Sequence, residues 1–221
     1  MTLHHVNTPT GMAESVFHTK SRDVRQPCQD DLIIMSGPWQ HPKPQQSQLR
    51  LVKIPELVLH ALALGKAEGI SAEFVTPYVA GSECTNLWRM RSEQIVNTPE
   101  DASWITRFVV VPNVRTPVGL AGFHGALDEV GMVEIGYRID PEHRRQGYAR
   151  QALETLLDVA ENHPDVQIVR ATISPDNIAS RALVDAYGFR EVGDQWDDED
   201  GLEIILEVSH IVHAPVRVSV Q

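Results

Sequence analysis

The chain has 221 residues, which is enough for one domain with an extension and a proper core. Thirty Asp and Glu against nineteen Lys and Arg give a formal net charge of −11, which argues against nucleic acid as the main partner and suits cationic substrates such as amines. Cys28 and Cys84 form neither a disulfide framework nor a metal-ligand spacing, and the early apolar run at 32–35 is too short for a signal peptide or a membrane span. We therefore expect a cytoplasmic protein with no metal ion, no nucleic-acid partner and no membrane segment.

The first 50 residues are polar, and the Pro- and Gln-rich run at 36–48 is typical of a linker. We expect residues 1–50 to form a partly ordered extension, or one draped on the domain, and residues 51–221 to form the domain. A first helix follows Pro55 and ends at Gly65, and its apolar stripe consists of Leu57, Val58, Ala61, Leu62 and Leu64. A second helix is predicted over 83–96.

Strands are predicted at 104–112 and 117–125, and a third over 132–139 shows a clear period of two. One face of this third strand carries Val133, Ile135, Tyr137 and Ile139, and the other carries Met132, Glu134, Gly136 and Arg138. A helix follows, with an apolar stripe of Ala149, Ala152, Leu153, Leu156, Leu157 and Ala160. Then come a strand at 166–174, a helix at 177–187 and a hairpin over 189–208 that turns in its acidic segment. This order predicts a mixed α/β sheet with helices on both faces.

The loop at 143–149 leads from the third strand directly into a helix N-terminus. Arginine side chains carry the wrong charge for the positive end of a helix dipole, so Arg144 and Arg145 are unfavourable there unless an anion is bound. Gly147 allows a close approach of the backbone to such an anion, and Ala149 is small enough not to block it. The loop alone is equally compatible with a phosphate site and with an ordinary solvated helix start.

Two motifs resemble those of the GNAT superfamily of acyl-CoA-dependent N-acyltransferases. Residues 144–149, "RRQGYA", match the signature Gln/Arg-x-x-Gly-x-Gly/Ala. A second signature, "NIASRALVDAYGF" at 177–189, follows at the expected separation. The resemblance covers residues 83–208, does not extend to residues 1–50, and is strongest to the RimJ/RimL-like branch, which includes protein N-terminal acetyltransferases.

The resemblance implies a fold of the α+β kind: a mixed, largely antiparallel central sheet with helices on both faces and two central strands that splay apart. It also implies acetyl-CoA as cosubstrate, with its pyrophosphate at the N–H groups of 145–149 and its pantetheine arm beside the strand at 137–139. For Asn177 an ordinary helix N-cap is an equally good explanation. The residues expected to bind the cofactor are Tyr137, Arg138, Ile139, Arg144, Arg145, Gln146, Gly147, Tyr148, Ala149, Arg150, Asn177 and Ser180.

Glu134 is the favoured candidate for the catalytic base. It lies within a strand expected at the centre of the sheet, where loss of solvent raises the pKa of a carboxyl group toward the working range. Alternatively, Glu134 pairs with a neighbouring cation, such as Arg107 or Arg138, and only stabilises the sheet. His124, one strand earlier, is the competing base or a proton relay.

One departure from the family pattern concerns the general acid. Many members carry a tyrosine at the position of Val184, as donor to the departing thiolate. Tyr187 lies on the apolar stripe of its helix, so we expect it to pack rather than to donate. The sequence therefore leaves the acid open.

The acceptor pocket is expected between the first two helices and the last hairpin. Trp88, Arg89, Arg91 and Glu93 lie on the second helix, and the acidic turn near 197–200 could hold a cationic acceptor or be a solvated turn. No cysteine stands beside an activating base, so we expect direct attack of a primary amine, from a protein N-terminus or a small molecule, in a ternary complex.

Other functional classes are weaker. A non-catalytic acyl-CoA-binding module is the alternative to the enzyme, and a monomer or a homodimer is expected in either case. A P-loop phosphotransferase is excluded because the chain has no glycine-rich loop ending in Gly-Lys-Ser/Thr.

Overall fold

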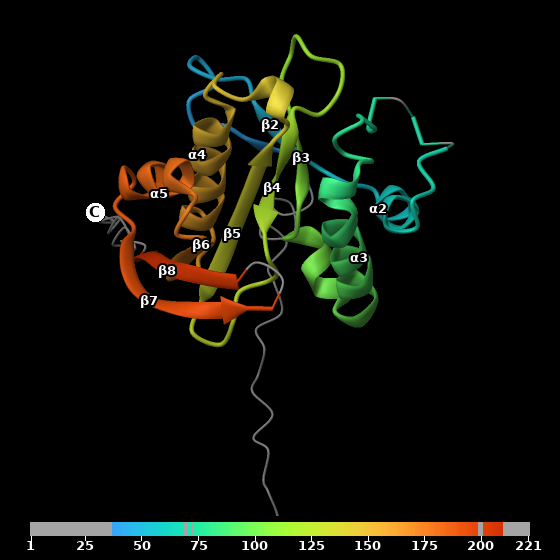
Figure 1. Cartoon of the computed structure of the whole chain (residues 1–221). Helices are drawn as coiled ribbons and strands as arrows, with labels where there is room; N and C mark the ends of the chain where they lie inside the picture. The colour runs from blue at the N-terminus through green and yellow to red at the C-terminus, as the bar shows by residue number, and fades with distance from the viewer. Residues whose placement is uncertain (1–36, 69, 72, 199–200, 210–221) are drawn as a thin grey trace, which may run out of the picture.

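The computed structural model describes residues 37–68, 70–71, 73–198 and 201–209, and arranges them around one eight-stranded sheet (Figure 1). The strands lie in the order β1–β2–β3–β4–β5–β6–β8–β7, and every neighbouring pair is antiparallel except the parallel pair β5 and β6. This confirms the mixed, largely antiparallel sheet. The strands are β1 Trp39–Gln40, β2 Arg50–Lys53, β3 Arg107–Val110, β4 Gly119–Phe123, β5 Met132–Ile139, β6 Ile168–Ile173, β7 Arg190–Asp197 and β8 Gly201–Ser209.

Helices lie on both faces of the sheet, with α2 and α3 on one side and α4 and α5 on the other (Figure 1). Alternation along β3 and β4 supplies both cores. On β3, for example, Phe108 packs with α2 and α3, whereas Val109 packs in the core under α4. The helices are α2 Glu56–Ala63, α3 Ser82–Asn97, α4 Tyr148–Glu161 and α5 Ile178–Asp185, with short 3₁₀ turns at η1 Pro99–Ser103 and η2 Pro141–His143.

Helix α2 forms where expected and buries part of the predicted stripe, with Leu62 in the core and Val58 packed against it. Leu57 and Leu64, both in the predicted stripe, are exposed, whereas Leu59 and Leu62 are buried in the core shared with α3. The helix is apolar on most sides, so several stripes can be drawn on it. Its contact with α3, and not its own pattern, decides which side is buried.

From residue 37 on, the described part of the N-terminal segment adds β1 to the sheet, which fits an extension draped on the domain better than a linker. Strand β1 pairs with β2, and the Trp39 ring meets Phe123 edge-on at a centroid distance of 5.4 Å. The guanidinium of Arg107 lies 3.5 Å from the centre of the same ring. The few apolar residues of this segment are held by contacts remote in sequence, which a local pattern does not reveal. Residues 1–36 lie outside the described residues.

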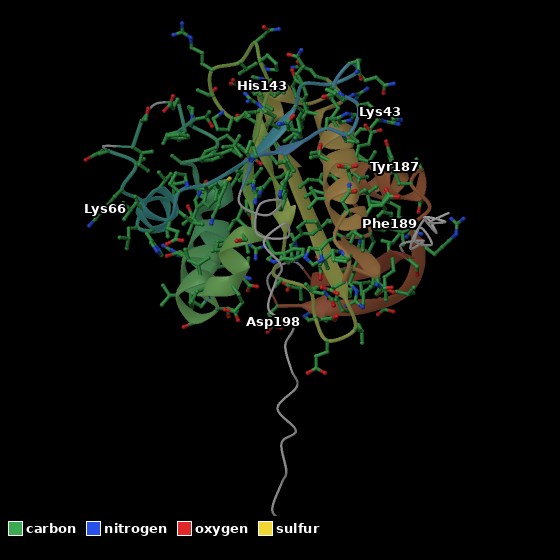
Figure 2. All side chains as sticks on the ribbon, turned by 180° about the vertical axis from the view of Figure 1, so that it is seen from behind. Lys43, Lys66, His143, Tyr187, Phe189 and Asp198 are labelled. Atoms are coloured by element: carbon green, nitrogen blue, oxygen red, sulfur yellow. The ribbon has the colours of Figure 1, made fainter. Side chains whose placement is uncertain are left out.

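Polar contacts also tie this segment to α4. The His41 Nε2 donates to Glu154 Oε2 at 2.6 Å, and the Ser47 hydroxyl donates to Gln151 Oε1 at 2.5 Å. Lys43 lies between His41 and Ser47 in the sequence, and Figure 2 shows it on the same side of the molecule as Tyr187. The loop between β1 and β2 is thus fixed against the helix that starts at the predicted phosphate loop.

The two central strands separate, as the family resemblance implied. Strand β5 pairs with β6 only at residues 132–134, although β5 continues to Ile139 and β6 to Ile173. On its other edge, β5 stays paired with β4 over residues 135–139. The second half of β5 therefore presents one edge of unpaired backbone groups to the opening between β5 and β6.

Truncation of Trp39 tests whether β1 belongs to the folded domain. Trp39 is 3% exposed, so we expect Trp39→Ala to lower the free energy of unfolding by about 3–5 kcal/mol, the range for large buried aromatic residues. Chemical denaturation measures this loss. The matched control is Trp196→Ala on β7, where the side chain is 74% exposed and the stability should hardly change. Equal stability of the two variants would return residues 37–48 to the role of a linker.

Candidate active site

The loop before α4 has the backbone geometry of an anion cradle. Gly147 caps the helix with φ of 80°, and Arg145 adopts φ of 63°, which is uncommon for a residue with a side chain. The first N–H groups of α4, from Tyr148 onward, have no carbonyl of their own helix to bond. The left-handed turns and the free N–H groups together form a concave, positively polarised site.

This cradle opens into a cavity of about 610 Å³, which we call the loop cavity. Every residue predicted to bind the cofactor lines it except Gln146, whose side-chain oxygen accepts a hydrogen bond from the Tyr148 hydroxyl at 3.1 Å. The Arg144 side chain also donates from Nε to the Ile139 carbonyl at 3.0 Å, so it joins the loop to the end of β5. Residues added by the structure are Tyr78, His143, Ala179 and Leu183.

Two tyrosine hydroxyls in the loop cavity, those of Tyr78 and Tyr137, are buried and make no regular hydrogen bond within the described residues. Burial raises the pKa of Tyr137, an effect that the nearby Ser180 hydroxyl partly offsets. Buried hydroxyls without partners are costly, and a bound molecule with amide groups and hydroxyls can satisfy them. The expected cofactor thus fits both the cradle and these donors.

Asn177 serves as the N-cap of α5, since its side-chain oxygen accepts from the Ser180 N–H at 3.1 Å. The capping explanation therefore holds for this residue. Asn177 nevertheless also lines the loop cavity, so capping does not remove it from the site.

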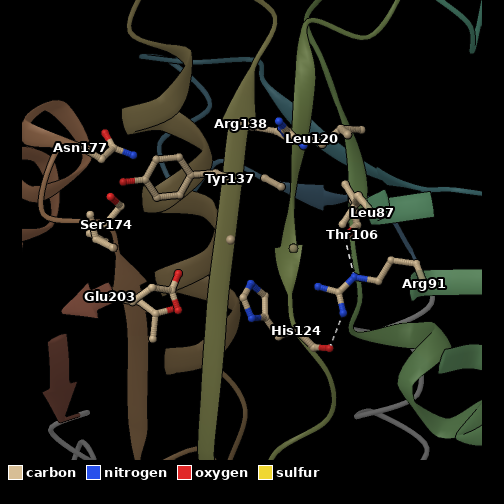
Figure 3. A pocket seen from close by; sticks show the side chains of 15 residues that line it. Leu87, Arg91, Thr106, Leu120, His124, Tyr137, Arg138, Ser174, Asn177 and Glu203 are labelled. Carbon is tan, nitrogen blue, oxygen red and sulfur yellow. Dashed lines mark hydrogen bonds between the residues drawn. The ribbon is translucent and has the colours of Figure 1, made fainter. Parts of the chain in front are cut away.

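A second cavity of about 510 Å³, the α3 cavity, lies beside the first and shares Tyr137, Arg138 and Asn177 with it (Figure 3). Its walls come from α3, from β3 to β6 and from β8. The two cavities meet where β5 leaves β6. The remaining lining residues are Leu87, Arg91, Thr106, Leu120, Ala121, Gly122, His124, Gly136, Thr172, Ile173, Ser174 and Glu203.

His124 and Glu134 are brought into contact. The His124 Nδ1 lies 3.2 Å from Glu134 Oε1, and the same oxygen accepts a hydrogen bond from the Thr172 hydroxyl at 2.5 Å. The His124 ring lies directly over Gly136, where a Cβ would come within 2.7 Å of Nε2. Glycine at that position is therefore what lets the imidazole lie across β5, with Nε2 free of hydrogen bonds to the described residues.

The two candidate bases differ in exposure. The side chain of His124 is 45% exposed and lines the α3 cavity, whereas that of Glu134 is 20% exposed and lies behind it. The cations that act on Glu134 are His124 and Arg170 rather than Arg107 or Arg138. The partners of Glu134 are His124 and Thr172, with Arg170 nearby.

The expected rise in the pKa of Glu134 does not occur. Burial alone would raise this pKa, but the hydrogen bond and charge of His124, the Thr172 hydroxyl and the charge of Arg170 outweigh it and hold the pKa below its usual range. Glu134 is therefore ionised near neutral pH. A carboxylate in that state is suited to orienting an imidazole and to stabilising its protonated form.

The predicted acceptor residues on α3 divide into two groups. Trp88 is core, with its indole N–H donating to the Val79 carbonyl at 2.7 Å, whereas Arg91 lines the α3 cavity. From the hairpin, Trp196 is exposed and Glu203 contributes to the cavity wall. Residues 199–200 of the acidic turn lie outside the described residues.

Val184, at the usual place of the acid, is fully buried in the core. Tyr187 packs against the same core, as expected, and its hydroxyl donates a hydrogen bond to Glu154 on α4. That hydroxyl is therefore engaged away from both cavities, neither of which Tyr187 lines.

Thr172 and Tyr78 were missed by the sequence reasoning. A signal existed for Thr172, because β6 alternates and the residue faces the same side of the sheet as Glu134. No comparable signal existed for Tyr78, which lies in an irregular segment before α3. The described ranges hold no cluster of three potential metal-ligating side chains and no helix long and apolar enough to cross a membrane.

Comparisons with known proteins identify the family of the chain. The sequence model of the acetyltransferase (GNAT) domain family matches residues 57–190. The chain is 36% identical over 87 residues to the uncharacterized N-acetyltransferase YjdG of Bacillus subtilis, covering 39% of this chain and 50% of that protein. It is 26% identical over 136 residues to the uncharacterized N-acetyltransferase p20 of Bacillus licheniformis, covering 61% of this chain and 76% of that one. The chain thus spans about half the length of the first of these relatives.

Solved structures share the fold at low sequence identity. The ribosomal L7/L12 α-N-protein acetyltransferase RimL, in complex with coenzyme A, superposes with a TM-score of 0.53 at 17% identity, over 74% of this chain and 95% of that one. RimJ of Mycobacterium smegmatis, in complex with a CoA disulfide, gives 0.51 at 17% identity, over 78% and 86%. With the family model covering most of the region from α2 to β7, the chain belongs to the GNAT acetyltransferase family.

Proposed function

We propose that the protein is an N-acetyltransferase that moves the acetyl group of acetyl-CoA to a primary amine by direct attack in a ternary complex. The observation that carries this proposal is the meeting of two cavities at the opening between β5 and β6. One cavity contains an anion cradle, and the other contains a histidine held by a carboxylate. A thioester in the first can thereby be reached by an amine in the second.

The loop cavity would hold the cosubstrate. Backbone N–H groups of 145–149 hold the pyrophosphate, and the side chains of Arg144, Arg145 and Arg150 face the same cavity. The unpaired edge of β5 and the hydroxyls of Tyr78 and Tyr137 bond the pantetheine arm. Acetyl-CoA supplies a thioester, an activated acyl group that an amine can attack.

In the α3 cavity, His124 acts as the base. An amine is protonated near neutral pH and must lose a proton before it can attack, and Nε2 of His124 is the acceptor with no bond to the described residues. Glu134 keeps the proton on Nδ1 and stabilises the imidazolium that forms. This proposal exchanges the roles expected from the sequence, with His124 as the base and Glu134 as the positioning residue.

Free backbone N–H groups on the β5 edge polarise the thioester carbonyl. Cys84 is fully buried, and burial raises the pKa of its thiol, which disfavours a covalent acetyl intermediate on this residue. Cys28 lies outside the described residues. A non-catalytic acyl-CoA-binding module needs only the loop cavity, so a histidine held by a carboxylate in the second cavity favours the enzyme.

The acceptor is a primary amine of a protein N-terminus or of a small molecule. Neighbours of the same fold include an enzyme named for an α-N-protein acceptor and a spermidine N-acetyltransferase chimera, so the fold accommodates both kinds.

Blocking the cradle tests the cofactor site. In Gly147→Glu, a carboxylate enters the place of the pyrophosphate, and we expect acetyl-CoA binding to be lost in calorimetry while the circular dichroism spectrum stays native. The matched control is Gly65→Glu, because Gly65 also has a positive φ, of 66°, and has no atom within 4 Å of an added Cβ. The control carries the same backbone strain far from the loop, so its affinity for acetyl-CoA should be unchanged. Unaltered affinity in Gly147→Glu would contradict the assignment.

Removal of the base tests the mechanism. His124→Gln should lower kcat by about 10²–10⁴-fold, the range for general-base catalysis, with little change in acetyl-CoA affinity. The wild-type pH profile of kcat/KM contains a contribution from protonation of the amine acceptor and one from the base, and His124→Gln should retain only the first. The lowered pKa of Glu134 keeps its carboxylate ionised throughout the neutral range, so Glu134 is not the source of the second contribution.

Two further variants complete the test. Glu134→Gln should cause a smaller loss of kcat, because the imidazole remains but is less well oriented. His60→Gln, which changes a histidine bonded to Ser92 on the outer helix pair, should stay fully active. An unchanged pH profile in His124→Gln would rule out His124 as the base.

A further inference from the structure

Arg91 is a buried cation in the wall of the α3 cavity. Its residue is 4% exposed, and three hydrogen bonds fix the guanidinium in place. The Nε donates to the Thr106 hydroxyl at 3.2 Å, while Nη1 donates to Gln94 Oε1 at 2.6 Å and to the His124 carbonyl at 2.7 Å. These bonds hold α3 against the sheet and orient the planar group.

The second terminal nitrogen, Nη2, makes no hydrogen bond within the described part of the chain. Figure 3 shows it pointing toward the His124 ring, into the cavity. Burial lowers the pKa of Arg91 to about 10, although the charges of Asp101 and Glu134 oppose the shift, so the group is still a cation at neutral pH. A buried cation with free N–H groups is costly unless an anion meets it.

The nearest carboxylates are engaged elsewhere. Asp101 accepts from the Ala126 N–H and from Gln94 Nε2, both at 2.7 Å, and Glu134 is bonded to His124 and Thr172. Arg91 forms no ion pair with any described residue by the usual distance of 4.0 Å. The free edge of the guanidinium is therefore available to a ligand of the cavity.

We propose that Arg91 binds a carboxylate of the acceptor, so that the acceptor is a primary amine with a carboxylate close to it. This inference rests on the proposed acetyl transfer, and it names the acceptor class of the same site. An amino acid has this arrangement, and so does a peptide that begins with Asp or Glu. In both, the carboxylate meets Nη2 while the amine faces Nε2 of His124.

The charges around the cavity favour a carboxylate over a phosphate. A single nitrogen of Arg91 is free, so the side chain offers one edge contact and not the two-sided clamp typical of phosphate sites. Glu203, across the cavity, repels a doubly charged phosphate more strongly than a singly charged carboxylate (Figure 3). The same carboxylate attracts the ammonium group of the acceptor, which gives the cavity opposite charges on opposite walls.

The test compares acceptors that differ in one group. Two pairs compare a carboxylate with an amide: alanine with alaninamide, and a tetrapeptide that begins with Asp with one that begins with Asn. A third pair, β-alanine with phosphoethanolamine, compares a carboxylate with a phosphate. We expect the carboxylate member of at least one of the first two pairs to have a kcat/KM at least tenfold higher, measured by thiol release. The amide is the more reactive amine at neutral pH because less of it is protonated, so a preference for the acid reports binding. The first two pairs distinguish a free amino acid from an acidic N-terminus.

Variants connect the preference to the residue. Arg91→Gln should remove it, and Arg91→Lys, which retains the charge, should keep part of it. The control is Arg89→Gln, which removes an exposed arginine from the same helix and should keep the full preference. Because Arg91 also braces α3, thermal melting is measured for each variant, and the wild-type comparison and Arg91→Lys remain informative if Arg91→Gln is unstable.

Calorimetry on the CoA-bound protein separates this inference from the proposed function. Tighter binding of the acids without any turnover would support the carboxylate site and contradict acetyl transfer. Turnover with equal kcat/KM for acids and amides would support the transfer and overturn the carboxylate site. A preference that survives in folded Arg91→Gln, or a preference for phosphoethanolamine over β-alanine, would also overturn it.

Discussion

The separation of β5 from β6 after Glu134 is the constraint on which the rest of the molecule depends. Inside a sheet, a strand normally pairs on both edges, but among the described strands the second half of β5 pairs only with β4. Unpaired backbone groups in a buried position cost free energy, and a ligand that runs along the edge can satisfy them. The opening also joins the loop cavity to the α3 cavity, so one irregularity provides both a binding edge and a passage between two substrates.

The chemistry of the site depends on Glu134, the last residue of β5 that pairs with β6. Glu134 is the residue at which β5 and β6 part, and its carboxylate is stabilised by Thr172 from β6 and by His124 from the end of β4. These contacts cross the sheet and keep the carboxylate ionised in spite of its burial. The imidazole is thereby fixed over Gly136 and directed to the acceptor side. The mouth of the opening and the proposed base are parts of one hydrogen-bonded unit.

Much of the loop before α4 could be predicted because its signals are local in the sequence. The alternation over β5, the arginines before α4 and the glycine at the cap lie within a few residues of each other, and they mark the loop whose left-handed turns precede α4. The roles of Glu134 and His124 could not be assigned in the same way. The pKa of Glu134 depends on Thr172 and Arg170, which lie on a strand more than thirty residues later. The alternation of side chains along β5 also could not show that His124, and not Glu134, lines the α3 cavity.

The packing of the N-terminal segment and the burial of Arg91 could not be predicted from the sequence, for related reasons. Trp39 is an isolated aromatic residue among prolines, and only its contacts with Phe123 and Arg107 make it part of the core. Arg91 sits in a helix with other charged residues, and nothing in the sequence distinguishes it from the exposed Arg89. What separates the two is the packing of α3 on the sheet, which buries one arginine against the cavity and leaves the other in solvent.

A crystal structure of the protein with coenzyme A would show whether the opening between β5 and β6 carries the cosubstrate. We expect electron density for the pyrophosphate at the N–H groups of 145–149, for the pantetheine arm along residues 137–139, and for the thiol at the opening between β5 and β6, facing His124. Pyrophosphate density away from the start of α4, or a thiol that ends outside the opening, would contradict it.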